Sequence, residues 1–121
     1  MKSDNVVQSK SYAFAIKIVN VYRILVEEKK EYVLCKQLLK SGTSIGANIE
    51  EAIGGQSDKD FLSKMSISYK ETRETIYWLR LLSDTGYLDK KAASELIGDA
   101  EELVKIVGAI QRTMKERINN S

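Results

Sequence analysis

A chain of 121 residues, 43% hydrophobic and 30% charged, fits one globular domain that buries its core without disulfides or a structural metal. Histidine is absent, which removes the commonest general base and metal ligand, and the single cysteine, Cys35, excludes an internal disulfide and a thiolate zinc site. The net charge of +2 is too small to indicate nucleic-acid binding by itself.

The absence of proline favours long helices, because no residue forces a kink. Over residues 9–28 apolar side chains recur with the helical period at Tyr12, Ala15, Val19, Tyr22 and Val26, with Ile18 and Leu25 beside them. The charged run 27–31 interrupts this pattern, and we place the first connection there, as solvated surface.

A second helix is predicted from an apolar face formed by Leu34, Leu38, Ile45, Ile49 and Ala52, with Cys35, Gly42 and Ile53 beside it. We expect Gly54 and Gly55 to end it in the left-handed conformation. Residues 57–60 offer N-caps for a third helix, which Gly86 closes. The apolar face of that third helix contains Phe61, Met65, Tyr69, Thr72, Ile76 and Leu79.

Asp89 is the predicted cap of a fourth helix, which has the most regular spacing in the chain. Its heptad seam contains Ala93, Leu96, Ala100, Leu103, Val107, Ile110 and Met114. Four helices with short connections predict an all-α protein with an antiparallel up-down four-helix bundle. We expect one domain over residues 1–121, with frayed ends at 1–8 and 119–121.

Small residues interrupt the second helix at Gly42, Ser44 and Gly46. A glycine inside a helix costs roughly 1 kcal/mol relative to alanine, so a compensating gain is expected. We predict that this gain is close packing against a neighbouring helix, and we favour it over a ligand pocket. Asn48, at the edge of the same face, is expected to bond a neighbouring helix with its amide.

Residues 44–52, SIGANIEEA, resemble the second-helix signature of the four-helix-bundle family named after proteins encoded in intervening sequences of bacterial 23S rRNA genes. Residues 61–68, 70–75, 77–82 and 86–88 are similar to its third helix. The resemblance implies a homopentamer, and most members of the family have no established activity. A related branch, the accessory protein of diversity-generating retroelements, binds nucleic acid and a reverse transcriptase as a basic pentamer.

A second, partly apolar line follows the third helix on the side opposite its core face: Ile67, Glu71, Glu74, Trp78 and Leu81. A bundle helix of a monomer should carry charge there, so the line predicts a subunit interface in a homo-oligomer. Trp78 is the expected anchor, because tryptophan is enriched at interface hot spots.

Basic residues on three helices are the candidate phosphate contacts: Lys10, Lys17, Lys36, Lys40, Lys70, Arg73 and Arg80. In one copy each of these residues is ordinary solvated surface. In an oligomer the same basic residues occur once in every copy, and affinity for phosphates grows with the number of charges neutralised. Nucleic acid, or a protein that processes it, is therefore the expected partner. No membrane, small-molecule substrate or cofactor is expected.

The alternative is a magnesium-dependent enzyme similar to the all-α nucleotide pyrophosphohydrolases. Its metal ligands would be Glu50 and Glu51 with Glu71 and Glu74, although that pattern expects a further glutamate where Gly54 stands. Surface charges and helix ion pairs are the simpler interpretation of these glutamates.

We expect a cytoplasmic protein, because the chain has a lone cysteine, no signal-peptide pattern and no apolar run of ~20 residues. The sequence as a whole predicts a non-enzymatic binding or scaffold protein with no catalytic residue and no metal site.

Overall fold

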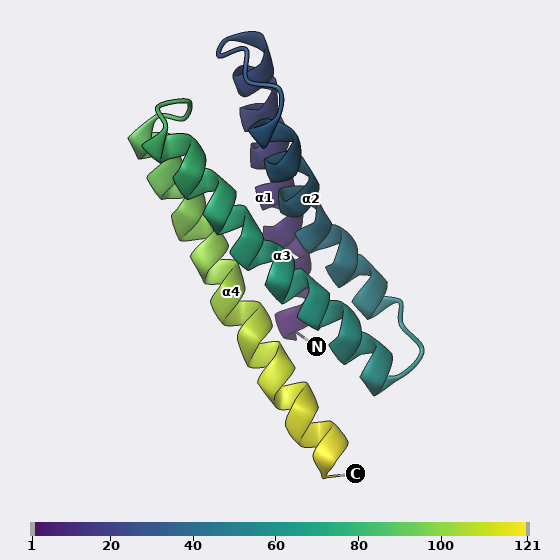
Figure 1. The fold of residues 1–121 in the computed structure, drawn as a ribbon. Helices are drawn as coiled ribbons and strands as arrows, with labels where there is room; N and C mark the ends of the chain where they lie inside the picture. Colours follow the sequence, from purple (N-terminus) through teal and green to yellow (C-terminus); the bar gives the residue numbers. More distant parts are fainter. Residues whose placement is uncertain (1, 121) are drawn as a thin grey trace.

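The computed structural model describes residues 2–120, and the side chains from residue 6 onward. The chain forms four helices, α1 (Lys2–Glu27), α2 (Leu34–Ile53), α3 (Asp58–Asp84) and α4 (Lys90–Asn119), which run up and down as long rods (Figure 1). Each helix contacts the next one in the chain, and α1 also contacts α4. This is the all-α, antiparallel four-helix bundle that the sequence predicts.

The N-terminal helix is longer than the sequence pattern indicates. Residues 1–8 were expected to be frayed; in the structure α1 begins at Lys2, and the side chain of Val7 is fully buried. Gln8 Nε2 also donates to Glu50 Oε1 of α2 at 2.7 Å. At Val7 and Gln8, α1 is therefore already packed against the bundle. At the other end α4 continues to Asn119, and residues 1 and 121 lie outside the described chain.

The buried face of α1 differs from the predicted one. Phe14, Ile18 and Leu25 are buried, whereas Tyr12, which began the predicted line, is 69% exposed. Two apolar lines run along this helix, and periodicity alone does not say which of them the neighbouring helices cover. The line through Ile18 is the one that meets the core.

The other three helices bury the faces that their spacing predicts. All seven residues of the α4 seam are buried, as are Leu38, Ile45 and Ile49 of α2. On α3, Met65 and Leu79 are buried, while aromatic and branched neighbours pack half-buried against the same core. The predicted hydrophobic core is therefore confirmed except on α1.

The helix starts confirm the two predicted caps. The Ser57 hydroxyl accepts from the backbone N–H of Asp60 at 3.0 Å, and the Asp89 carboxylate accepts from Ala92 at 3.1 Å. Gly86 has φ +86°, the left-handed conformation that closes α3. Gly54 is not left-handed, because its φ is −82°. The predicted left-handed end of α2 at this glycine is therefore wrong.

The charged run before α2 contains a buried group that the sequence pattern did not reveal. Glu31 is only 8% exposed, and its carboxylate accepts from the backbone N–H groups of Val33 (3.0 Å), Leu34 (2.9 Å) and Cys35 (2.6 Å). Burial by itself raises the pKa of Glu31, but these three hydrogen bonds outweigh it, so the pKa lies below its ordinary value. The run 27–31 is thus not all solvated surface, because Glu31 caps α2.

The glycines of α2 lie where α1 approaches most closely. A Cβ built on Gly42 would lie 2.8 Å from both Cγ1 and Cγ2 of Ile18, closer than real Cβ atoms come to other atoms. At Gly46 a Cβ would lie 3.3 Å from Ser11 Oγ and 3.5 Å from the Ser11 backbone carbonyl. Glycine therefore permits the contact between α1 and α2, which at Gly46 involves both the hydroxyl and the backbone of Ser11.

The polar residues of this stretch bond differently from the prediction for Asn48. Its Nδ2 donates to the Ser44 carbonyl of its own helix at 2.8 Å, and Ser44 Oγ donates to the Lys40 carbonyl. Instead, α3 supplies the interhelical bonds, in a buried seam where Ser68 Oγ donates to the Ile45 carbonyl of α2 at 3.0 Å. A second bond of this seam joins the hydroxyls of Thr75 and Ser41, also at 3.0 Å. These four residues fix the register of α2 against α3.

Candidate functional site

A groove of about 490 Å³ lies between α3 and α4. It is lined by Arg73, Ile76, Tyr77 and Arg80 from α3 and by Glu101, Val104 and Lys105 from α4. The polar residues stand on the rims because both helices turn their other faces, through Leu79 and Leu103, into the core. The groove therefore combines an apolar floor with charged walls.

The charge of the groove is predominantly positive. Arg73, Arg80 and Lys105 are exposed, and none of them forms an ion pair or a side-chain hydrogen bond within residues 2–120. Glu101 is the one acidic residue among those that line it. Arg73 and Arg80 lie two turns apart on one helix, about 10 Å along its axis. The arrangement can bind an extended anion.

An exposed aromatic ring lies between these two arginines in the sequence. Tyr77 is 55% exposed, and its ring meets that of Trp78 edge to face, with centroids 5.0 Å apart and planes at 77°. Trp78 is half-buried against the core, and its Nε1 donates to Glu74 Oε2 at 3.1 Å. The tyrosine ring is thus held by a neighbour that is itself fixed on two sides.

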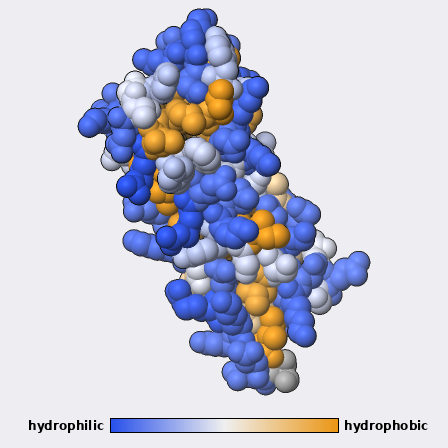
Figure 2. All heavy atoms as spheres, in the orientation of Figure 1, coloured by the Kyte–Doolittle hydropathy of each residue, from blue (hydrophilic) through white to orange (hydrophobic). Residues whose placement is uncertain are grey.

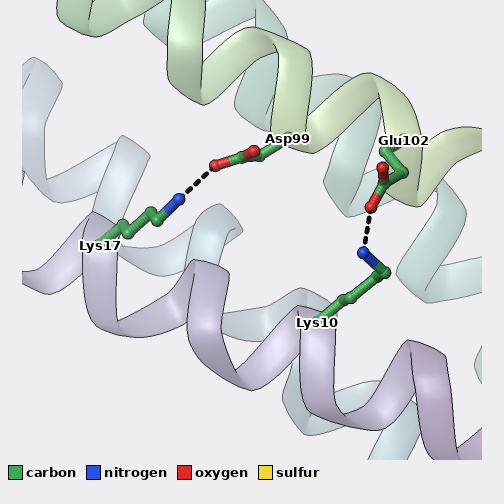
Figure 3. A network of polar contacts seen from close by, with 4 residues as sticks. All are labelled: Lys10, Lys17, Asp99 and Glu102. Atoms are coloured by element: carbon green, nitrogen blue, oxygen red, sulfur yellow. Dashed lines mark hydrogen bonds and ion pairs between the residues drawn. The ribbon is translucent and has the colours of Figure 1, made fainter.

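Two of the predicted phosphate contacts are engaged within the bundle. Lys10 Nζ lies 2.6 Å from Glu102 Oε1 and Lys17 Nζ lies 2.7 Å from Asp99 Oδ2, so that both pairs join α1 to α4 (Figure 3). The hydrogen bond to Asp99, with its charge, raises the pKa of Lys17. These lysines stabilise the contact between the two helices and are not available to a ligand without breaking it.

Removing one of these pairs is expected to have a small effect. Lys17→Ala should lower the free energy of unfolding by less than about 1 kcal/mol, because both side chains of the pair are partly exposed. Since folding raises the pKa of Lys17, the contribution is present below its unfolded pKa near 10.5 and is lost as pH rises through the folded pKa. Urea unfolding at neutral and alkaline pH, with Lys115→Ala as the control for loss of an exposed α4 lysine, measures this. If Lys17→Ala and Lys115→Ala lowered the free energy of unfolding equally at both pH values, a stabilising role of the Lys17–Asp99 pair would be contradicted.

The remaining predicted cations divide between the groove and other surfaces. Lys36 and Lys40 on α2 and Lys70 on α3 are exposed but do not line the groove. Arg73 and Arg80 do line it, and the structure adds Lys105, which the sequence analysis missed. Lys105 gave no signal in the sequence, because only the packing of α4 against α3 brings it opposite the arginines.

The predicted second face of α3 is largely half-buried in the single chain. Trp78 and Leu81 are half-buried, Ile67 is 36% exposed, and Glu71 is half-buried beside Glu74. Burial, followed by the neighbouring charge of Glu74, raises the pKa of Glu71. Part of the apolar character of this line is therefore explained by packing within one bundle.

The four glutamates of the enzyme alternative do not come together. Glu50 accepts a hydrogen bond from Gln8 of α1, whereas Glu51 faces Lys64 at 3.5 Å. The antiparallel register of α2 and α3 places Glu71 about two turns away from them, because its neighbours on α3 pair with Ser41 and Ile45. Within residues 2–120 no three acidic, cysteine or histidine side chains are grouped to hold a metal ion. The magnesium cluster of the alternative is therefore not formed by these four glutamates.

The sequence pattern of the 23S rRNA-intervening sequence proteins matches residues 3–109. The chain belongs to this family. It is also 48% identical to a protein of unknown function from the S23 ribosomal protein family of Bacteroides thetaiotaomicron VPI-5482, whose crystal structure is known at 1.70 Å. That similarity covers 91% of this chain and 98% of the other, with a TM-score of 0.90. No curated protein matches the chain.

The part of the chain shared with the 23S rRNA-intervening sequence family contains every residue that lines the groove. It also contains the glycines of α2, so the resemblance seen in the second and third helices is confirmed. None of the helices in residues 2–120 is long and apolar enough to span a membrane.

Proposed function

We propose that this chain acts by binding rather than by catalysis, as a cytoplasmic module whose partner is nucleic acid. The observation that carries the proposal is the α3–α4 groove, where Arg73, Arg80 and Lys105 face solvent without ion-pair partners among the described residues. A guanidinium group can donate two parallel hydrogen bonds to one phosphate and is weakly hydrated, so two arginines on one wall favour a phosphate backbone.

The groove is a better candidate than the other basic surfaces for a physical reason. Lys10 and Lys17 would have to exchange carboxylate partners for phosphates, with little net gain. Lys36 and Lys40 are exposed on α2 and do not line the groove. The groove brings unpaired cations, apolar side chains and an exposed aromatic ring together.

Self-association is the second part of the proposal, and the family resemblance implies a homopentamer. Each copy would add one groove, so the modest charge of a single chain would be multiplied along one ligand. Apolar side chains left exposed on α1, Tyr12 at 69% and Ile16 at 49%, support contact with another copy. In Figure 2 the visible face is mostly hydrophilic, with apolar side chains gathered in a few patches.

Light scattering tests the assembly and the part of Trp78 in it. We expect the wild-type mass to be a multiple of the monomer's 13.7 kDa and the Trp78→Ala variant to shift toward smaller species. Circular dichroism of the same samples verifies that the helices are intact. An unchanged mass with an intact fold would reject Trp78 as the anchor, and a monomeric wild type would reject self-association.

Binding to labelled structured RNA, single-stranded RNA and duplex DNA tests the choice of partner. Fluorescence anisotropy over a series of salt concentrations should give an affinity that falls steeply as salt rises, because bound cations release counterions from the phosphates. Light scattering in the same buffers records the assembly. No binding near physiological salt, with the assembly intact, would reject nucleic acid and leave a protein scaffold as the better account.

A further inference from the structure

The ring of Tyr77 has no partner on its groove side among the described residues. Its one ring contact is the edge-to-face packing on Trp78, and 55% of its surface remains exposed. A tyrosine presented in this way has an apolar face available for stacking. Trp78, which packs against the core and donates to Glu74, is a fixed neighbour for the ring on its other side.

The cations of the groove lie before, after and across from this ring. Arg73 precedes Tyr77 by four residues and Arg80 follows it by three, so all three lie along one side of α3. Lys105 faces them from α4. A ligand that lies along the groove therefore meets a cation before the ring, a cation after it and a third across from it.

We infer that the α3–α4 groove takes single-stranded nucleic acid, with one unpaired base stacked on Tyr77 and the flanking phosphates bound by Arg73, Arg80 and Lys105. The inference rests on the proposed function and names the form of nucleic acid that the same groove binds. In a continuous duplex each base is already stacked on its neighbours, so it cannot present a face to the ring. Sites that combine a positive groove with exposed aromatic rings bind single strands with little sequence preference.

The chain contains its own reporter for this contact. Trp78 is the only tryptophan, and its ring centroid is 5.0 Å from that of Tyr77. Titration with a twelve-nucleotide oligothymidylate should therefore quench tryptophan fluorescence in the wild type. A twelve-base-pair duplex is the matched probe, which carries phosphates but no unpaired base.

Three variants separate stacking from charge. Tyr77→Ala is expected to weaken binding of the oligothymidylate about tenfold, within the range for loss of one stacked base, while duplex binding changes less than twofold. Tyr77→Phe, which keeps the ring, should bind like the wild type. Tyr32→Ala is the control, because it removes a tyrosine that is 51% exposed, close to the exposure of Tyr77, and does not line the groove.

The outcomes distinguish this inference from the function on which it rests. If the wild type binds neither probe, the proposed function fails. If it binds both probes and Tyr77→Ala changes neither affinity, or weakens both equally, nucleic-acid binding stands and the stacking inference is overturned. Equal displacement of the oligothymidylate by polyglutamate of the same charge would also overturn it, because the groove would then recognise charge alone.

Discussion

Replacing Gly42 with leucine is expected to destabilise the bundle by more than about 3 kcal/mol, enough to leave much of the protein unfolded. The first side-chain atom alone would lie 2.8 Å from two carbons of Ile18, and Ile18 is fully buried, so it has little space to move away. Relief requires α1 and α2 to separate, which opens the core along their whole seam. Denaturant unfolding followed by circular dichroism measures the loss.

Alanine substitutions provide the matched control. Gly98 on α4 is exposed, and a Cβ built there meets nothing within 4 Å, so Gly98→Ala should raise stability by about 0.5–1 kcal/mol through helix propensity. Gly42→Ala gains the same propensity but should still lower stability by about 1–3 kcal/mol. In an Ile18→Ala background the penalty at position 42 should shrink, because the opposing carbons are gone. A neutral Gly42→Ala would contradict close packing at this glycine.

Replacing Glu31 with alanine is expected to cost about 2 kcal/mol or more. One carboxylate accepts from three backbone N–H groups at the start of α2, and the N-cap residue itself, Val33, contributes no side-chain bond. A lost cap costs about 0.5–2 kcal/mol, and hydrogen bonds to a charged group are stronger than neutral ones. Glu28→Ala, which removes an exposed carboxylate from the same connection, is the control and should change little.

The same residue gives a defined acid dependence. Folding lowers the pKa of Glu31 below its ordinary value of 4.5, so its contribution to stability is fully present above that pH and is lost as pH falls through the folded pKa. Wild-type stability should therefore drop more steeply below about pH 4.5 than that of Glu31→Ala. Urea midpoints measured from neutral pH down into the acid range decide this. If the urea midpoints of the wild type and of Glu31→Ala fell in parallel with pH, the assignment of Glu31 as the cap of α2 would be contradicted.

Local patterns predicted most of the fold because the information lies within single helices. The α4 seam from Ala93 to Met114 and the caps at Ser57 and Asp89 depend on spacing and on side-chain chemistry only. The predicted buried face of α1 was wrong because two apolar lines, one through Tyr12 and one through Ile18, run along the helix, and only the neighbouring helices select between them. The Glu31 cap was missed because a charged run is normally solvated.

The candidate site was predictable only in part. The heptad spacing placed Arg73 and Arg80 on one side of α3, but Lys105 joins them only through the register between α3 and α4. In the sequence, Lys10 and Lys17 cannot be told from the other candidate phosphate contacts. Their carboxylate partners on α4 lie more than 80 residues away along the chain. Which surface cations remain unpaired is a property of packing, which a single sequence does not show.

Charge reversal in the groove tests the central claim most directly. The double variant Arg73→Glu/Arg80→Glu is compared with Lys36→Glu/Lys40→Glu, which changes net charge equally on exposed α2 positions outside the groove. For a labelled single-stranded RNA, the groove variant should lose at least about tenfold in affinity, and its plot of log Kd against log salt concentration should be shallower by about 1.4. The affinity and the salt slope of the α2 variant should stay close to those of the wild type. Equal weakening by both variants, with both folds intact, would contradict the groove as the nucleic-acid site.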